Sequence, residues 1–403
     1  MPGPPCPGPL AGYRIVDLTS MISGPLATMI LADQGADVIK VENPDGGDHT
    51  RAANNRRNGF SASFLNNNRN KRSLALDLKA PGARDALLRL AATADVFIQN
   101  FRPGVVERMG LGEDAVRAVA PNIIYVSICG FGETGPYAQK PVYDPLIQAV
   151  SGLATVQAGS DTERPRLVRT IIPDKLTGYN AAQAITAALL HRERTGPGEY
   201  RGQHIRLSML DAIIAFLWSS DMGSQTFVEE TIPQQEAASF IDLIYETATT
   251  PISAAVQTNR EWAALTRALD RPEWLTDPRF LTPALRQRHI NERLAMTQDV
   301  LRTRPAAEWL DRLTREGVPC APVLTRTQML SDPQVIANGI VVETMHRTAG
   351  RLRQARPAAR FSGTPTPIRA GAPALGEHTA EILGELGYAP SEIEALTAKE
   401  PTA

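Results

Sequence analysis

The chain has 403 residues, with 42 Lys and Arg against 43 Asp and Glu, and its formal net charge is -1. This length allows a large core and two domains. The balanced charge disfavours nucleic acid and membrane surfaces as partners, and no apolar run approaches the ~18 residues of a membrane span.

Cysteine and histidine usage argues against a disulfide framework and against a metal site. Cys6, Cys129 and Cys320 lie far apart and form no C-x-x-C pair, and the six His residues show no metal-ligand spacing. The first six residues lack the basic region and apolar core of a signal peptide. These features predict a protein of the reducing cytoplasm, without a metal.

The first elements along the chain read as a βαβ unit. Residues 13–18 and 36–42 predict two strands. Between them, Ser23-Gly24-Pro25 predicts a turn, with Pro25 as the first helical residue, and a helix follows to Gln34. The alternation then continues through a strand at 73–78, a helix at 81–93, a strand at 95–99, a short helix at 104–118 and a strand at 123–128.

Strands that alternate with helices predict an α/β protein with a Rossmann-like, mostly parallel sheet covered on both faces. Ligands of such sheets bind beyond the carboxyl ends of the strands. We therefore expect the site in the loops that follow Leu18, Glu42, Gln99 and Cys129.

A basic stretch lies between residues 51 and 79, where Asp77 is the one acid. Its cations favour a small polyanionic ligand, and a solvated basic face explains them equally well. Within and after it, residues 66–72 suit phosphate oxygens, and residues 100–104 suit a stacked purine beside a phosphate. The cations are Arg51, Arg56, Arg57, Arg69, Lys71, Arg72 and Lys79.

Residues 130–135 follow a strand and match G-x-G-x-x-G literally. A dinucleotide site needs a helix that opens on those glycines. Pro136 follows directly and Pro141 comes soon after, so the motif predicts a glycine loop beside a site and disfavours NAD binding.

Asp174 stands alone where a loop becomes a helix, with no His, Cys or second acid close in sequence. It has two plausible roles. Its oxygens can cap the helix, or it can act as a nucleophile beside helix-terminal N–H groups that stabilise an oxyanion. This segment alone leaves both open.

The second half of the chain is less regular. Residues 177–220 predict helix, 221–250 irregular chain, and 250–330 a smaller α+β unit with helices at 259–269 and 306–316 and a strand at 319–323. The proline-rich tail predicts an extended segment on the surface.

Many short segments, taken in order, resemble the family III CoA transferases, of which formyl-CoA transferase is a member. No single segment decides, but their number and order make the resemblance specific, and it runs almost end to end. The segments are Gly24-Pro25, Gly35 to Glu42, Gly47-Asp48, Asn70 to Ser73, Leu76 to Lys79, Ala94 to Val96, Asn100 to Gly104, Gly130 to Gly132, Thr134 to Pro136, Tyr143-Asp144, Ser151-Gly152, Asp174, Thr195 to Gly198, Asp277 to Phe280, Gly317 to Pro319 and Ala374 to His378.

The resemblance implies that Asp174 is the catalytic residue, supported by Tyr143 and Asp144. Asp174 would attack an acyl-CoA thioester, and CoA would reach the acceptor acid through a mixed anhydride and an aspartyl-CoA thioester. The implied CoA contacts are Ser23, Leu76, Lys79, Asn100, Phe101, Val105, Arg108, Met109 and Tyr143. Ordinary core packing is the plain alternative for Leu76, Val105 and Met109.

Three departures from the family pattern bear on the substrate. Asn43 stands where the family often has Arg, so Arg51 or Lys71 would have to meet that phosphate. Ile22 stands at a Gln position, which makes oxalate a poor candidate acceptor. The covering loop is altered too, because residues 210–257 contain one glycine, Gly223. With Leu146 and Ile147, Ile22 favours a dicarboxylic or branched acid.

Two rival functions remain at this point. The α-methylacyl-CoA racemases share the fold and use a His-Asp pair, but the matching pair here is Tyr143-Asp144, and tyrosine is a poor proton acceptor at neutral pH. A non-catalytic CoA-binding protein is the second. The resemblance further implies an interlocked homodimer in which residues 1–220 begin a large CoA-binding domain, 221–330 form a small domain, and 331–403 return to complete the large one.

Overall fold

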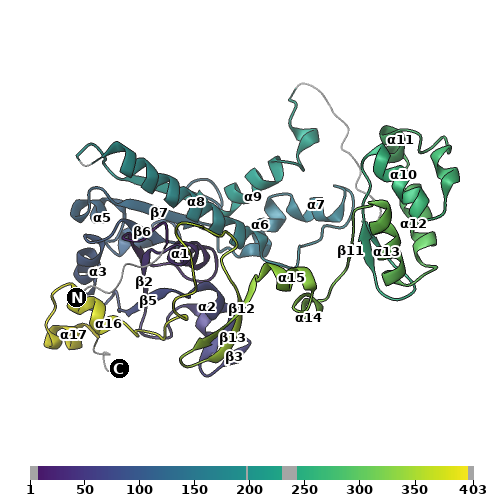
Figure 1. Cartoon of the computed structure of the whole chain (residues 1–403). Helices are drawn as coiled ribbons and strands as arrows, with labels where there is room; N and C mark the ends of the chain where they lie inside the picture. The colour runs from purple at the N-terminus through teal and green to yellow at the C-terminus, as the bar shows by residue number, and fades with distance from the viewer. Residues whose placement is uncertain (1–7, 197, 229–242, 398–403) are drawn as a thin grey trace. The chain divides into compact units, whose positions relative to one another are not determined.

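The computed structural model describes residues 8–196, 198–228 and 243–397, and these form two compact units. The larger unit takes described residues 8–158, 164–196, 198–228 and 339–397, so the chain leaves it and returns. The smaller unit takes residues 159–163 and 243–338. In Figure 1 the larger unit is an α/β structure with helices on both sides of its sheet, which confirms the predicted fold class.

The central sheet has six strands in the order β5-β2-β1-β6-β7-β8, and every neighbouring pair is parallel. Consecutive residues of β1 point to opposite faces, so Ile15 packs on one side and Val16 on the other. Both faces are therefore apolar. The strands are β1 (Arg14–Asp17), β2 (Asp37–Glu42), β5 (Lys71–Ala75), β6 (Val96–Gln99), β7 (Ile124–Cys129) and β8 (Gln203–Ser208).

Two groups of helices cover the two faces of the sheet. On the Ile15 face, α1 (Ser23–Asp33) and α8 (Ile172–Thr195) contribute small residues such as Ala27 and Ala181. On the Val16 face lie α3 (Ala83–Ala91), α5 (Glu113–Val119) and, from the end of the chain, α16 (Thr379–Glu385). The remaining elements of the larger unit are η1 (His49–Ala52), β3 (Arg56–Arg57), β4 (Phe60–Ser61), α2 (Ala62–Asn67), α4 (Val105–Arg108), α6 (Asp144–Val150), α7 (Leu153–Ala158), α9 (Met209–Trp218), η2 (Gly223–Gln225), β12 (Val341–His346), β13 (Gly350–Ala355) and α17 (Pro390–Thr397).

Three predictions from the sequence are wrong in this unit. Ser23, Gly24 and Pro25 are not a turn but the first residues of α1. The expected helix at 104–118 divides into α4 and α5, because Gly110 adopts a left-handed φ of 69° between them. The predicted helical stretch 177–220 contains β8, an edge strand whose Ile205 and Leu207 alternate with polar residues.

The tail is also more structured than an extended segment. Strands β12 and β13 form an antiparallel hairpin, and α16 and α17 follow it. Part of the tail lies along the edge strand β5, where His378 N donates to Ser73 O (3.0 Å). Ile382 and Leu383 then enter the core.

The smaller unit packs around Trp262, Trp274 and Trp309 beside a three-stranded antiparallel sheet. Helix α13 has the predicted bounds, and Thr258 and Glu261 form a capping box at the start of α10. Its elements are β9 (Ile244–Tyr245), β10 (Ile252–Ala254), α10 (Asn259–Ala268), η3 (Pro272–Leu275), α11 (Pro283–Arg288), α12 (Ile290–Leu301), α13 (Ala306–Glu316), β11 (Cys320–Pro322), α14 (Arg326–Met329) and α15 (Pro333–Asn338).

Cys129 and Cys320 are free thiols, and Cys6 lies outside the described residues. Within the described ranges, no helix has the length and apolar character that crossing a membrane requires.

Candidate active site

Asp174 lies in the first turn of α8, and close packing brings the start of α1 against it. Gly178, one turn further on, faces Ser23 so closely that a Cβ there would lie 2.8 Å from Ser23 O. Gly24 faces Thr19 in the same way, with 2.3 Å to its Cβ. These two glycines allow the β1–α1 turn, the start of α1 and the start of α8 to meet.

Asp174 does not cap α8 in the way the sequence allowed. Ile171 occupies the N-cap position without a side-chain hydrogen bond. The Asp174 backbone N–H donates to Asp144 Oδ2 (3.1 Å), and Asp144 Oδ1 accepts from Gln148 Nε2 (2.6 Å). The buried Asp144 therefore satisfies an amide of the first turn of α8, which leaves the Asp174 carboxylate for another role.

The surroundings of Asp174 change its acidity. Burial, and then the negative charge of Asp144, raise its pKa from 3.8 to about 6, while a hydrogen bond from the Ser23 backbone N–H acts in the opposite direction. Asp174 is therefore ionised at neutral pH but poorly solvated. A strongly perturbed carboxyl group beside a cavity is a typical feature of a functional site.

The Asp174 side chain lines a cavity of about 190 Å³ at the carboxyl ends of the central strands. Cations and apolar side chains share its wall, so it suits a ligand with both characters. The lining residues are Ser20, Met21, Ser23, Asn100, Phe101, Arg102, Pro103, Ile128, Cys129, Gly130, Phe131, Ala138, Lys140, Val142, Tyr143, Asp174 and Met209.

A second cavity, of about 240 Å³, shares Ser20 and Phe101 with the first. Its wall comes from the loops after β1, β2 and β5, with Asn43, His49 and Lys79 among its residues. The two cavities therefore adjoin at the Phe101 ring. The turn residue Ser20 is held there because Asn100 receives its N–H (3.0 Å) and donates to its C=O (2.8 Å).

The structure brings most of the predicted site residues to these two cavities. Ser23, Asn100, Phe101, Tyr143 and Asp174 line the first, and Leu76, Lys79, Phe101 and Met109 line the second. Val105 and Arg108 line neither cavity. Asp144 lies buried behind Asp174 and does not line the first cavity.

The two cations proposed to replace an arginine at Asn43 are both unsuitable. Lys71 is fully buried and holds Asp17 and Asn68. Arg51 pairs with Glu42 through two nitrogens. The exposed basic side chains at the second cavity include Lys79 and His49, and His49 was not among the residues predicted from the sequence.

Two further cations of the basic stretch, Arg69 and Arg72, form internal ion pairs, whereas Arg56 and Arg57 are exposed. Arg69 pairs with the buried Asp33 (2.7 Å), and Arg72 pairs with Asp37 (2.6 Å) and with Glu385 from the tail (2.6 Å). These cations join distant parts of the larger unit. The charges of Arg69 and Arg72 therefore belong to internal ion pairs.

The aliphatic residues that suggested a less polar substrate do not line the first cavity. Ile147 is buried in the core, Leu146 lies exposed on α6, and Ile22 precedes α1. The apolar wall comes from other residues, namely Met21, Ile128, Phe131, Val142 and Met209. Their position after strand ends was a usable signal for Phe131 and for Lys140, which follow β7.

A third and larger cavity, of about 480 Å³, contains a chain of side chains in catalytic-triad order. Ser127 Oγ lies 2.8 Å from His204 Nε2, and His204 Nδ1 lies 2.7 Å from Glu113 Oε2. Ser127 sits inside β7, which pairs with β6 and β8 on its two sides. The strand amides beside it are thus used by the sheet and cannot serve as the oxyanion donors that a serine nucleophile requires.

Comparison with known proteins adds an independent observation. Residues 10–379 match the family model described as CoA-transferase family III. The chain is 34% identical over 385 residues to succinyl-CoA:glutarate CoA-transferase of Homo sapiens, covering 94% of this chain and 86% of that protein. It is 32% identical over 413 residues to formyl-CoA:oxalate CoA-transferase of Escherichia coli, covering 96% and 98%.

A solved structure extends the similarity to the fold. A CAIB/BAIF family protein from Brucella suis superposes with a TM-score of 0.80 at 30% identity, covering 94% of this chain and 100% of that one.

Proposed function

Because the chain belongs to CoA-transferase family III, its substrates are a CoA thioester and a carboxylic acid, and we propose that Asp174 is the residue that carries the transferred group. The observation that carries this proposal is the position of Asp174, at a cavity wall, with its pKa raised to about 6. Burial leaves the carboxylate with little water around it, and an exposed acid would be fully solvated.

The proposed reaction proceeds in four balanced steps. The Asp174 carboxylate attacks the thioester carbonyl, which forms an aspartyl–acyl anhydride and releases CoA thiolate. The thiolate attacks the aspartyl carbonyl and releases the donor acid, leaving an aspartyl-CoA thioester. The acceptor carboxylate then displaces the thiolate to form a second anhydride, and the thiolate attacks its acyl carbonyl, giving the new acyl-CoA and free Asp174.

The adjoining cavities provide a place for each part of the donor. We propose that the second cavity holds the nucleotide of CoA, where Lys79 and His49 lie near its phosphates and Leu76 and Met109 contact its base. The chain of CoA would then pass Phe101 and Ser20 to bring the thioester to Asp174. Val105 and Arg108 remain proposed contacts on the helix after Phe101.

For the acceptor we propose a dicarboxylate with a short aliphatic chain. One carboxylate would react at Asp174, and the other would meet Lys140 or Arg102, which have no ion-pair partner among the described residues. Met21, Phe131 and Met209 would contact the methylene groups. The human relative, named for succinyl-CoA and glutarate, supports this class.

The test is a transfer assay read by mass spectrometry. Succinyl-CoA would be offered with glutarate, adipate, oxalate and a branched monocarboxylic acid, and glutaryl-CoA or adipyl-CoA is the expected product. Hydroxylamine added during turnover should convert Asp174, and no other acid, to a hydroxamate. Turnover without any modified Asp174 would overturn its covalent role.

A control separates the racemase alternative. A 2-methylacyl-CoA in deuterated water, without acceptor acid, should gain no α-deuterium, because Asp144 is buried and bound to Gln148 and the Asp174 amide. Deuterium incorporation would favour racemisation. We further propose a cytoplasmic homodimer, which sedimentation analysis of the purified protein and cell fractionation would check.

A further inference from the structure

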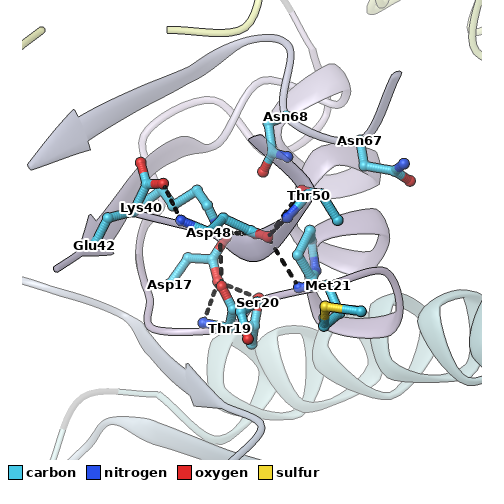
Figure 2. Close-up of polar contacts among 12 residues, drawn as sticks. Asp17, Thr19, Ser20, Met21, Lys40, Glu42, Asp48, Thr50, Asn67 and Asn68 are labelled. Carbon is cyan, nitrogen blue, oxygen red and sulfur yellow. Dashed lines mark hydrogen bonds and ion pairs between the residues drawn. The ribbon is translucent and has the colours of Figure 1, made fainter. Parts of the chain in front are cut away.

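A cluster of buried charges lies beneath the turn that joins β1 to α1 (Figure 2). Lys40 Nζ is 2.9 Å from Asp48 Oδ2, and Lys71 Nζ is 3.1 Å from Asp17 Oδ2; all four side chains are completely shielded from solvent. Two positive and two negative charges balance one another. Burying four charges costs free energy even when they are paired. The contacts of these side chains with the backbone indicate the role of the cluster.

The buried charges hold the backbone of the turn directly. Asp17 Oδ1 accepts the Thr19 N–H (2.9 Å), and Lys40 Nζ donates to Thr19 O (2.6 Å). Asp48 Oδ1 accepts the Met21 N–H (3.2 Å). Figure 2 shows Asp17 and Asp48 approaching the turn from two sides. Asn100 binds the N–H and C=O of Ser20. Side chains therefore bind backbone polar groups of three consecutive residues, Thr19, Ser20 and Met21.

Met21 makes this support necessary. Its φ of 70° lies in the left-handed region, which is unfavourable for a residue other than glycine. Such a conformation persists only when neighbouring contacts fix it, and Asp48 supplies one of them. Met21 is also part of the wall of the Asp174 cavity.

The same cluster fixes the far side of the turn. Lys71 Nζ donates to Pro25 O (3.0 Å), and Asp17 Oδ2 accepts the Thr28 hydroxyl (2.6 Å) in the first turns of α1. Ser23 lies between these two anchored stretches. Its backbone N–H is the donor that opposes the rise in the Asp174 pKa.

We propose that Asp48, together with Asp17 and Lys40, positions the β1–α1 turn so that the Ser23 amide faces Asp174 in the reactive geometry. This inference rests on the proposed role of Asp174. These three residues touch neither the reacting atoms nor Asp174, and they act through Thr19, Met21 and Ser23.

Asp48→Asn tests the proposal, with Asp33→Asn as its matched control. Both changes remove one carboxylate charge from a buried ion pair, Lys40–Asp48 or Arg69–Asp33. Asp33 is the last residue of α1, about 15 Å along the helix from Ser23. The milder Thr19→Val, which removes only the hydroxyl bound to Asp17, serves if Asp48→Asn does not fold.

In the transfer assay with succinyl-CoA and glutarate, Asp48→Asn should lower kcat at least about tenfold. The pKa of the acid limb of the pH–rate profile should rise, because the hydrogen bond that the Ser23 amide donates to Asp174 becomes weaker. Asp33→Asn should change neither value. The titratable or charged neighbours of the cavity are unchanged in all variants; they are Asp144, Lys140, Arg102, Tyr143 and Cys129.

Other outcomes would contradict the proposal. Asp48 lines the second cavity, so its negative charge could act on the substrate directly. In that case Asp48→Asn would lower the KM for the CoA ester, or lower the pKa of the acid limb, without reducing kcat. Equal loss of kcat in the Asp48 and Asp33 variants would mean that the cluster serves stability only.

A readout without substrate separates failure of this inference from failure of the proposed function. Amide hydrogen exchange over residues 18–23 should accelerate in Asp48→Asn and stay unchanged in Asp33→Asn, whatever acid the enzyme accepts. Unchanged exchange over this turn in Asp48→Asn would overturn the positioning role even if transfer were lost.

Discussion

The cavity beside Asp174 and the cavity beside Ser127 teach opposite lessons about what makes a site. The Ser127 cavity is larger and contains Ser, His and Glu in hydrogen-bonded order. The Asp174 cavity offers a single carboxylate and a second acid behind it. In the first, the strand amides beside Ser127 are used by the sheet, whereas the second places a poorly solvated carboxylate beside the Ser23 amide. The surroundings of a residue, more than its type, decide what it can do.

The largest expected difference between the two cavities appears when the hydroxyl or carboxylate of each is removed. Asp174→Asn should lower kcat by about 1000-fold or more, because the amide cannot form the anhydride. Ser127→Ala should leave kcat within about threefold of wild type, since the Ser127 hydroxyl bonds Gln99 and His204 and does not line the Asp174 cavity. Steady-state kinetics with succinyl-CoA would check both, and a reversed order would break the comparison.

A packing change tests the close approach that builds the Asp174 site. Gly178→Ala places a Cβ 2.8 Å from Ser23 O, so α1 and α8 must separate. We expect a loss of about 1–3 kcal/mol in the free energy of unfolding together with a lower kcat. Gly384→Ala, where a new Cβ meets open space, is the control for denaturant melts and kinetics.

The pH dependence of turnover provides a third test. With the Asp174 pKa at about 6, kcat/KM should rise about tenfold per pH unit below pH 6 and level off above it, because the ionised form is the nucleophile. Measurements of kcat/KM in buffers from pH 4.5 to 8 would show this acid limb of the profile. An acid limb near pH 4 would mean that Asp174 is well solvated.

The smallest effect concerns stability. The folded pKa of Asp174 lies above its unfolded value of 3.8, so ionisation weakens the folded state as pH rises from about 4 to about 6. Asp174→Asn should therefore raise the free energy of unfolding at pH 7 by about 1 kcal/mol and change it little at pH 4. Urea melts at the two pH values would measure the difference.

Much of the larger unit was predictable because its signals are local. Short, largely apolar runs that alternate with helical segments predicted β1, β2 and β7, and the loops after those strands line the two cavities. The edge strand β8 was missed although Ile205 and Leu207 alternate with polar residues, since its flanks read as helix.

The site was harder to predict where partners lie far apart in the sequence. Asp144 is 30 residues from the Asp174 amide that it receives, and Lys71 is 54 residues from Asp17. A cation in the sequence gives no sign of whether water or a distant carboxylate will surround it. Lys71 and Arg69 therefore read as ligand contacts, while the fold uses them as internal partners.

The return of the tail to β5 has a consequence for how the protein is made. His378 and Thr379 bond the Ser73 and Ala75 backbone along that edge of the sheet. The ribosome synthesises the whole smaller unit before these residues emerge. Until then β5 presents unpaired amides and the Ile382 and Leu383 contacts are missing, a combination that favours aggregation of nascent chains. Assistance from a chaperone would matter most during this interval of translation.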